Sequence, residues 1–246
     1  MNADEKVRLP IIVAHRGASV AAPENTLASI RAAVQAGADW VEWDTRVTSD
    51  GRLLLQHDET LERFTGKKMK VADLTFDETQ KVDVGEWFDE RFAGEKMPAL
   101  WEAIEVSLPG VMPLIERKAG SAEQHFTVLR GMNVLEQVVV QAFDWEFLRQ
   151  LRELAPEMRI GALGKKKIGK EKMAEVLELK PNYVGWKAKD LRQGDVERLH
   201  AEGIGVVVWT VDSPAEIRKF VSWGIDAIIT NDPAHTRKIV EGCTGN

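Results

Sequence analysis

Histidine, arginine and carboxylate residues recur at the ends of consecutive apolar segments in the first half of the chain. His15 and Arg16 follow the first such segment, Glu42 and Asp44 lie in the second, and His57 follows soon after. Paired imidazoles can accept and supply protons near neutral pH, and grouped carboxylates can hold a divalent cation. This combination is suited to cutting a phosphate ester, so it favours an enzyme.

Two pairs of residues point to a metal site. Residues two apart on a strand share a face, so Glu42 and Asp44 project together, and Glu116 and Lys118 form a second pair at the end of a later strand. Three carboxylates meeting at one place would repel one another unless a cation lay between them. Their oxygen atoms favour Mg²⁺ or Ca²⁺, and the lack of a nearby cysteine disfavours zinc. The alternative is that Glu42 and Asp44 form salt bridges with Arg16 and Lys118.

The five histidines divide into two groups. His15 and His57 each end a strand-like segment, which makes them candidates for the base and the acid of phosphodiester cleavage. For either one taken alone, a buried imidazole with satisfied ring nitrogens is the alternative. His125, His200 and His235 lie in helix-like or loop surroundings, and we expect them at the surface.

Further candidates concern substrate binding. Arg16 can bind phosphate oxygens through two nitrogens, and Lys118 can add a charge beside them. Trp209 could pack against the substrate; the alternative is a place in the core, where a lone aromatic residue is more often found. Lys165, Lys166 and Lys167 follow the fifth predicted strand, where they form either a solvated face or a rim that attracts anions.

The overall composition is that of a folded globular protein. The chain has 246 residues, 44% hydrophobic and 29% charged, with a formal net charge of −6. That charge argues against a general nucleic-acid binder. The single cysteine, Cys243, excludes an intrachain disulfide, and we see neither a secretory signal nor an apolar run that could span a membrane. We therefore expect a cytoplasmic location without stable membrane insertion, and the oligomeric state stays open.

Eight apolar runs of strand length are spread along the chain, and helical patterns lie between most of them. The predicted strands are residues 11–14, 40–45, 112–116, 138–142, 159–162, 183–186, 205–211 and 227–230, and the predicted helices include residues 26–36, 145–154, 172–179, 193–202 and 214–223. Alternation of apolar strands with helices predicts an α/β fold, a (β/α)8 TIM barrel with a small insertion after the second strand. The candidate residues would then meet at the carboxyl ends of the strands.

Residues 58–98 interrupt this alternation. They are rich in charge and follow a turn signal and a short returning strand at residues 53–57, so we expect an insertion at the barrel mouth within a single barrel domain spanning residues 1–246. Phe88, Phe92 and Met97 could form an apolar lip at the mouth or the insertion's own core.

The ordered set of motifs resembles the glycerophosphodiester phosphodiesterase family over almost the whole chain. The matching segments include His15-Arg16-Gly17, Pro23-Glu24-Asn25-Thr26-Leu27, Glu42-Trp43-Asp44, His57-Asp58, Ile115-Glu116-Arg117-Lys118, Trp209-Thr210-Val211 and Thr230-Asn231-Asp232-Pro233. One departure is Ala142-Phe143, where the family usually has Ser-Phe.

The resemblance implies specific roles for these residues. It implies a divalent metal held by Glu42, Asp44 and Glu116, an acid–base pair in His15 and His57, and phosphate binding by Arg16 and Lys118. The small-molecule substrate would be a glycerophosphodiester, and the products glycerol 3-phosphate and an alcohol. By analogy with two-histidine barrel phospholipases, we predict His15 as base and His57 as acid.

Two alternatives use the same centre differently. One is lysophospholipase D or phosphoinositide-type cleavage of an acylated substrate, which needs an apolar groove at the mouth. The other is a non-catalytic barrel that only binds phosphodiesters.

Overall fold

The strands of the protein close into a barrel. The computed structural model describes residues 9–108 and 110–243; residues 1–8, where the sequence shows no secretory signal, lie outside them. The parallel strands are β1 (Ile11–Ala14), β2 (Trp40–Val47), β4 (Met112–Arg117), β5 (Val139–Ala142), β6 (Arg159–Gly164), β7 (Tyr183–Lys187), β8 (Gly205–Trp209) and β9 (Ala227–Thr230). Pairing of β1 with both β9 and β2 closes the ring. The predicted (β/α)8 barrel is confirmed.

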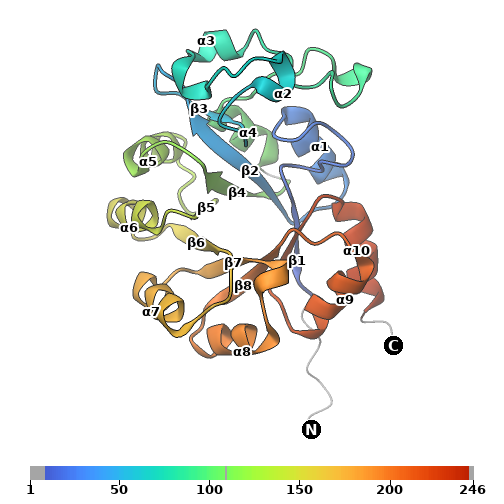
Figure 1. The fold of residues 1–246 in the computed structure, drawn as a ribbon, viewed down its shortest axis with the longest axis vertical. Coiled ribbons are helices and arrows are strands. Elements are labelled where there is room, and N and C mark those ends of the chain that lie inside the picture. Colours follow the sequence, from blue (N-terminus) through green and yellow to red (C-terminus); the bar gives the residue numbers. More distant parts are fainter. Residues whose placement is uncertain (1–8, 109, 244–246) are drawn as a thin grey trace.

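Helices cover the outside of the barrel (Figure 1). They are α1 (Leu27–Gln35), α4 (Leu100–Ser107), α5 (Ala122–Gly131), α6 (Trp145–Leu154), α7 (Lys170–Leu179), α8 (Gln193–Ala201), α9 (Pro214–Ser222) and α10 (Pro233–Gly242), with a short 3₁₀ turn η3 (Ala188–Asp190) after β7. Local sequence explains several starts. Thr26 caps α1 in a capping box with Ser29, Asp144 caps α6, and Pro214 occupies the first turn of α9.

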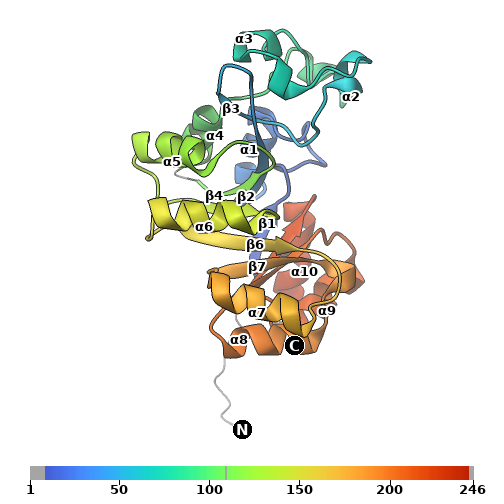
Figure 2. The same ribbon diagram turned by 60° about the vertical axis from the view of Figure 1, so that its left-hand side comes forward.

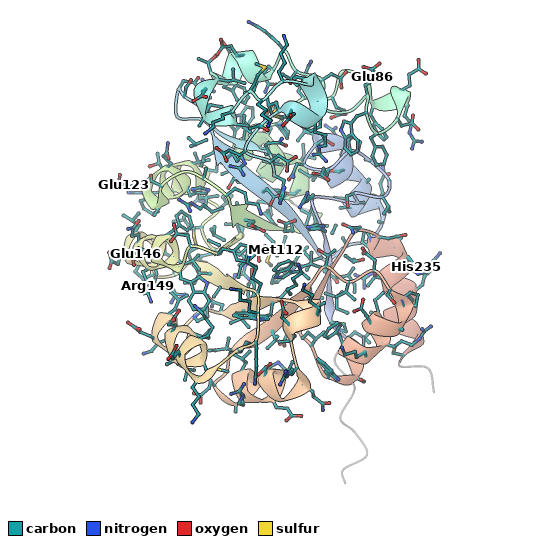
Figure 3. All side chains as sticks on the ribbon, viewed as in Figure 1. Glu86, Met112, Glu123, Glu146, Arg149 and His235 are labelled. Atoms are coloured by element: carbon teal, nitrogen blue, oxygen red, sulfur yellow. The ribbon has the colours of Figure 1, made fainter. Side chains whose placement is uncertain are left out.

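Apolar side chains fill the barrel interior near the starts of the strands. Val139 and Tyr183 are buried there with Leu114 and Val207, and the first residues of β2 and β4, Trp40 and Met112, pack against them. Met112 lies near the middle of the molecule in Figure 3. A larger apolar layer separates the strands from the helices. Because the lower interior is filled, polar chemistry is confined to the carboxyl ends of the strands.

The segment after β2 builds the insertion. β3 (Leu53–Leu55) returns antiparallel to β2, and residues 58–98 then contain α2 (Glu62–Thr65), η1 (Val71–Asp73), α3 (Phe76–Thr79) and η2 (Glu90–Phe92). These elements extend beyond one end of the barrel (Figures 1 and 2). Leu54 of β3 is buried together with Leu61, Val71, Val84 and Met97. We propose that insertion and barrel form one domain, because β3 belongs to both.

The three aromatic and methionine side chains suggested as a lip have different surroundings. Met97 is 1% exposed and belongs to the insertion core. Phe88 and Phe92 are half-buried and meet edge to face with ring centroids 5.7 Å apart. Met97 therefore contributes nothing to a lip at the mouth.

The prediction that His125 lies at the surface was wrong. Its side chain is fully buried, with Nδ1 donating to the Ser121 carbonyl oxygen at 3.0 Å and Nε2 lying 3.0 Å from the Thr45 hydroxyl. Burial lowers the pKa of His125 to about 4. The ring fills the layer between β2 and α5, where a polar group is tolerated because both nitrogens have partners. His200 and His235 are exposed as expected, and His235 projects outward from α10 (Figure 3).

The strand predicted for residues 205–211 is shorter in the structure, where β8 ends at Trp209. None of the helices in the described part of the chain is long and apolar enough to cross a membrane.

Candidate active site

A cavity of about 260 Å³ opens at the carboxyl ends of the strands, and we call it the mouth cavity. Seven of the eight predicted site residues line it: His15, Arg16, Glu42, His57, Glu116, Lys118 and Trp209. The eighth, Asp44, is buried and contacts Arg16 and Lys118. Residues from five strands and their following loops thus meet at one place, as the barrel geometry predicts.

The three predicted metal ligands form a compact buried cluster. One carboxylate oxygen from each of Glu42, Asp44 and Glu116 lies within 4.8 Å of the others. Burial raises the pKa of Glu42 well above its ordinary value, and the charges of Asp44 and Glu116 raise it further. Burial also raises the pKa of Glu116 to about 7, with the charge of Asp44 adding to the effect. The cluster is therefore short of positive charge.

Asp44 is the member of the cluster with the most partners. Lys118 Nζ and Arg16 Nε lie 3.2 and 3.3 Å from its oxygen atoms, and Asn25 Nδ2 donates to Oδ2 at 3.0 Å. Burial alone would raise the pKa of Asp44, but the charges of Lys118 and Arg16 outweigh it and lower the pKa. The salt bridges that the sequence offered as an alternative are present at Asp44, and they coexist with the cluster.

The turn after β1 wraps around Glu42. The backbone N–H of Arg16 donates to Glu42 Oε2 at 2.9 Å, and that of Gly17 donates to the Glu42 carbonyl at 3.1 Å. Gly17 has φ +82°, and a Cβ there would lie 2.3 Å from Ser29 Oγ. Only glycine allows this backbone to approach α1 so closely. The His-Arg-Gly motif therefore has two roles. Its backbone forms the turn that holds Glu42, and its His15 and Arg16 side chains line the mouth cavity.

Arg16 is held on both sides by acids. Its Nη1 donates to Glu24 Oε1 at 2.9 Å, and the same oxygen accepts from Arg63 of the insertion at 2.8 Å. Charges of Asp44 and Glu24 outweigh the effect of burial and raise the pKa of Arg16. The guanidinium is therefore fixed beside the cluster and always charged.

His15 is oriented by a chain of hydrogen bonds. Its Nδ1 lies 2.7 Å from Asn231 Oδ1, while Asn231 Nδ2 and N–H donate to the two carboxylate oxygens of Asp212 at 2.6 and 2.8 Å. Because the Asn231 amide nitrogen faces Asp212, its oxygen must accept from a protonated Nδ1. His15 Nε2 then carries the lone pair. Burial, followed by the charge of Arg16, lowers the pKa of His15.

His57 stands where the barrel passes into the insertion. Its Nδ1 lies 2.9 Å from Asp58 Oδ1, an ion pair when the imidazole is protonated. Arg46 of β2 donates to the His57 carbonyl oxygen through Nε and Nη2 at 2.9 and 2.8 Å. The backbone of His57 is therefore fastened to the barrel although the residue lies beyond β3.

Aromatic residues form the opposite wall of the mouth cavity. Trp209 meets Phe143 edge to face with ring centroids 5.8 Å apart, and Phe143 is 42% exposed. Ala142, which replaces the serine usual in the family, is fully buried in the layer between strands and helices. The departure from the family motif therefore lies outside the cavity.

The lysine run lies close to this wall. Lys165 and Lys166 line a groove of about 640 Å³ that shares Phe143 and Leu163 with the mouth cavity. Lys165 Nζ lies 5.8 Å from the centre of the Phe143 ring. Lys165 and Lys166 thus lie beside the mouth, a position compatible with either of the two interpretations, a solvated face or a rim that attracts anions.

Several residues of the site escaped the sequence reasoning. Asn231 and Asp212 orient His15, Arg46 holds His57, Gln141 lines the cavity, and Asn25 braces Asp44. Asn25 directly precedes Thr26, the residue that caps α1. Asn231 could have been found from its motif after β9. Asp212 and Gln141 carry no local signal.

The profile of the glycerophosphoryl diester phosphodiesterase family matches residues 15–235. The chain therefore belongs to this family, and the predicted enzyme class, a phosphoric diester hydrolase, is confirmed.

Relatives and solved structures cover nearly all of the chain. It is 34% identical to a glycerophosphodiester phosphodiesterase of Caldanaerobacter subterraneus, covering 91% of this chain and 94% of the relative. A Bacillus subtilis enzyme of the same name is 31% identical, with 94% and 87% covered. An Oleispira antarctica phosphodiesterase, solved in complex with the product sn-glycerol-3-phosphate, has a TM-score of 0.86 at 27% identity, covering 95% of this chain and 97% of that one.

The carboxylate cluster fits the divalent cation that the family implies. Lys118 and Arg16 supply two positive charges against three carboxylates, and the raised pKa values of Glu42 and Glu116 indicate a remaining shortage of positive charge. An all-oxygen set suits a hard cation such as Mg²⁺ or Ca²⁺.

Proposed function

We propose that this protein hydrolyses glycerophosphodiesters to glycerol 3-phosphate and an alcohol, with a divalent cation held by Glu42, Asp44 and Glu116. One observation carries the proposal: a buried cluster of three acids borders the mouth cavity through Glu42 and Glu116, and two histidines with different hydrogen-bond partners line the same cavity. When bound, the cation would supply a Lewis acid that polarises the phosphoryl group and favours ionisation of a nearby hydroxyl.

His15 is the general base in this proposal. Its Nδ1 proton is engaged by Asn231, so Nε2 is available to accept a proton from the attacking group, either water or the 2-hydroxyl of the glycerol. The lowered pKa of His15, caused by burial and Arg16, keeps the imidazole neutral at pH 7. A neutral imidazole is the form that can act as a base.

His57 is the general acid. A protonated His57 donates Nδ1–H to Asp58 and retains Nε2–H for the oxygen of the departing alcohol. The carboxylate of Asp58 offsets the positive charge of the imidazolium. The two histidines therefore have neighbours of opposite character, Arg16 beside His15 and Asp58 beside His57, which matches the division of labour.

Lys118 and Arg16 bind the phosphate. The Lys118 ammonium has three N–H donors, of which Asp44 and Glu116 engage two, so one remains for a phosphoryl oxygen. Arg16 lines the same cavity with its guanidinium fixed by Glu24. The positive charges of Lys118 and Arg16 would offset the negative charges of the clustered carboxylates and of the bound phosphate.

The decisive experiment is an assay of the purified protein with glycerophosphocholine. We expect release of glycerol 3-phosphate that stops on chelation and returns with Mg²⁺ or Ca²⁺. A parallel reaction with lysophosphatidylcholine tests cleavage of an acylated substrate, and a higher rate there would replace the proposal. Binding of glycerophosphocholine without release of product would instead indicate a non-catalytic barrel.

A further inference from the structure

One arginine of the insertion contacts two carboxylates, each of which is bound to a different site residue. Arg63 of α2 donates from Nη2 to Glu24 Oε1 at 2.8 Å, and the same oxygen accepts from Arg16 at 2.9 Å. Arg63 Nε lies 3.7 Å from Asp58 Oδ2, and Oδ1 of Asp58 lies 2.9 Å from His57 Nδ1. Arg63 is thus one carboxylate away from the proposed phosphate-binding arginine and one carboxylate away from the proposed acid.

The guanidinium of Arg63 is held in place by the insertion. Its central carbon lies 4.7 Å from the centre of the Phe64 ring and 4.8 Å from that of Trp87. The Trp87 ring is fixed in turn, because its Nε1 donates to the Val84 carbonyl oxygen at 2.7 Å. Leu61, two residues before Arg63, is fully buried in the insertion core. A guanidinium packed against two rings is already oriented when it binds the carboxylates.

Both carboxylates that Arg63 contacts are kept ionised. Burial would raise the pKa of Glu24, but the hydrogen bond from Arg63 and the charge of Arg16 outweigh it and lower the pKa. Burial would also raise the pKa of Asp58, but the hydrogen bond to His57 and the charge of Arg63 lower it. An ionised Glu24 orients Arg16, and an ionised Asp58 stabilises the protonated form of His57.

These contacts join the barrel to the insertion beside the site. Glu24 precedes α1 of the barrel, whereas Asp58 and Arg63 belong to the insertion. A shift of Arg63 would therefore disturb the partners of His57 and of Arg16 together. Arg63 does not line the mouth cavity, so it can act on the reaction only through its neighbours.

We propose that Arg63 is a positioning residue that aligns the acid His57, through Asp58, and the phosphate-binding Arg16, through Glu24. This inference rests on the proposed function and adds a residue on which protonation of the departing alcohol depends. It assigns to the insertion a part in the reaction, because one guanidinium on α2 sets the partners of both groups.

An ordinary salt bridge is the competing explanation. The Arg63 side chain is 32% exposed, and exposed ion pairs commonly contribute little. A pair that only fastens the insertion to the barrel would change the rates of all substrates by one factor. Positioning of His57 instead predicts a loss that depends on how much the leaving group needs a proton.

The test compares two leaving groups with the purified protein in saturating Mg²⁺. Glycerophosphocholine releases an alkoxide that needs the acid, whereas the diester of glycerol 3-phosphate with p-nitrophenol releases a phenolate that leaves without a proton. We expect Arg63→Met to lower kcat/KM by about 30-fold for the choline substrate and by about threefold for the nitrophenyl substrate. The ratio of the two values should therefore fall by about tenfold.

Two further variants separate the two contacts. Asp58→Asn should lower the same ratio, and adding Arg63→Met to it should lower the ratio no further, because both changes act on His57. Glu24→Gln and Arg63→Met should each weaken binding of sn-glycerol 3-phosphate by about threefold in calorimetry, because both loosen Arg16.

Arg91→Met is the matched control. Arg91 lies in η2 of the same insertion, 4.9 Å from the centre of the Phe92 ring and 3.6 Å from an oxygen of Asp89. Neither of these partners lines the mouth cavity, so the variant should keep both rates and their ratio. Arg63→Lys keeps the charge without the planar fork and should lower the ratio by about threefold, which carries the test if Arg63→Met fails to fold by circular dichroism.

An unchanged ratio in the folded Arg63 variants would overturn the inference, even if both rates fell together. The proposed hydrolysis would stand in that case. A further fall of the ratio when Arg63→Met is added to Asp58→Asn would also overturn the stated route through Asp58. A wild type that cleaves neither substrate would remove the proposed function, and the inference with it.

Discussion

Asn231 Oδ1 lies 2.7 Å from His15 Nδ1, and Asp212 fixes the orientation of that amide through two further hydrogen bonds. His15 directly follows β1 and Asn231 directly follows β9, the two strands that meet where the barrel closes. The protonation of the proposed base is thus set by a residue 216 positions away in the chain.

Removing this support should reduce turnover. We expect Asn231→Ala to lower kcat by about 10- to 100-fold with little change in KM, because the imidazole loses its fixed tautomer and orientation. Ser19→Ala is the matched control, since the Ser19 hydroxyl donates to the same oxygen at 3.1 Å without touching His15. Wild-type kcat in Asn231→Ala would contradict this role.

The two histidines should each be essential. His15→Ala and His57→Ala are expected to lower kcat by about 10²–10⁴-fold while the far-ultraviolet circular dichroism stays unchanged. His235→Ala on the exposed face of α10 provides the control and should retain full activity (Figure 3). Near-normal turnover in either active-site variant would exclude the acid–base pair.

Cation binding should be visible as stability. Adding Mg²⁺ or Ca²⁺ to chelator-treated protein should raise Tm, and a concentration of about 100 Kd corresponds to about 2.7 kcal/mol. Glu116→Gln should remove most of this rise, because it deletes one charged ligand of the buried cluster. Glu123→Gln, on the exposed surface of α5, should leave it intact. A Tm indifferent to both cations in wild type would count against the metal site.

Buried His125 should make the fold sensitive to mild acid. Its folded pKa of about 4 lies below the unfolded value of about 6.5, so the unfolded state binds more protons between these values. Stability from this group is complete above pH 6.5 and is lost as the pH falls toward 4. Going from pH 7 to pH 5 should cost about 2 kcal/mol.

Urea unfolding at the two pH values measures this cost. His125→Gln removes the titration and keeps polar atoms near Thr45 and Ser121. The loss between pH 7 and pH 5 should be about 2 kcal/mol smaller in the variant than in wild type. Identical pH dependence would show that His125 does not drive the acid sensitivity.

The sequence predicted the barrel because its strands and helices carry strong local signals. Residues 11–14 and 227–230 were predicted as strands with the bounds seen in β1 and β9, and residues 145–154 with those of α6. Glu42, Asp44 and Glu116 could be grouped in advance because parallel strands in a barrel bring their carboxyl ends together.

What the sequence could not predict depends on distant contacts. His125 was predicted at the surface because it has no neighbour in sequence like the Arg16 beside His15 or the Asp58 beside His57. Its burial depends on Thr45 and Phe147 from other elements. Gln141 looked like an ordinary strand residue, since only the closed barrel shows that it lines the mouth cavity. Periodicity cannot report such long-range pairings.

The position of His57 ties turnover to a part of the chain outside the barrel. His15 is supported by strands of the ring, whereas His57 begins the segment that leaves it, and Glu24 joins Arg16 of the ring to Arg63 of that segment. A bare ring stripped of residues 58–98 would keep Lys118 and Arg16, the proposed phosphate-binding residues, but His57 would lose Asp58, the carboxylate that pairs with its imidazole. Trimming this protein to its simplest scaffold should therefore leave a receptor for its product and no longer a catalyst.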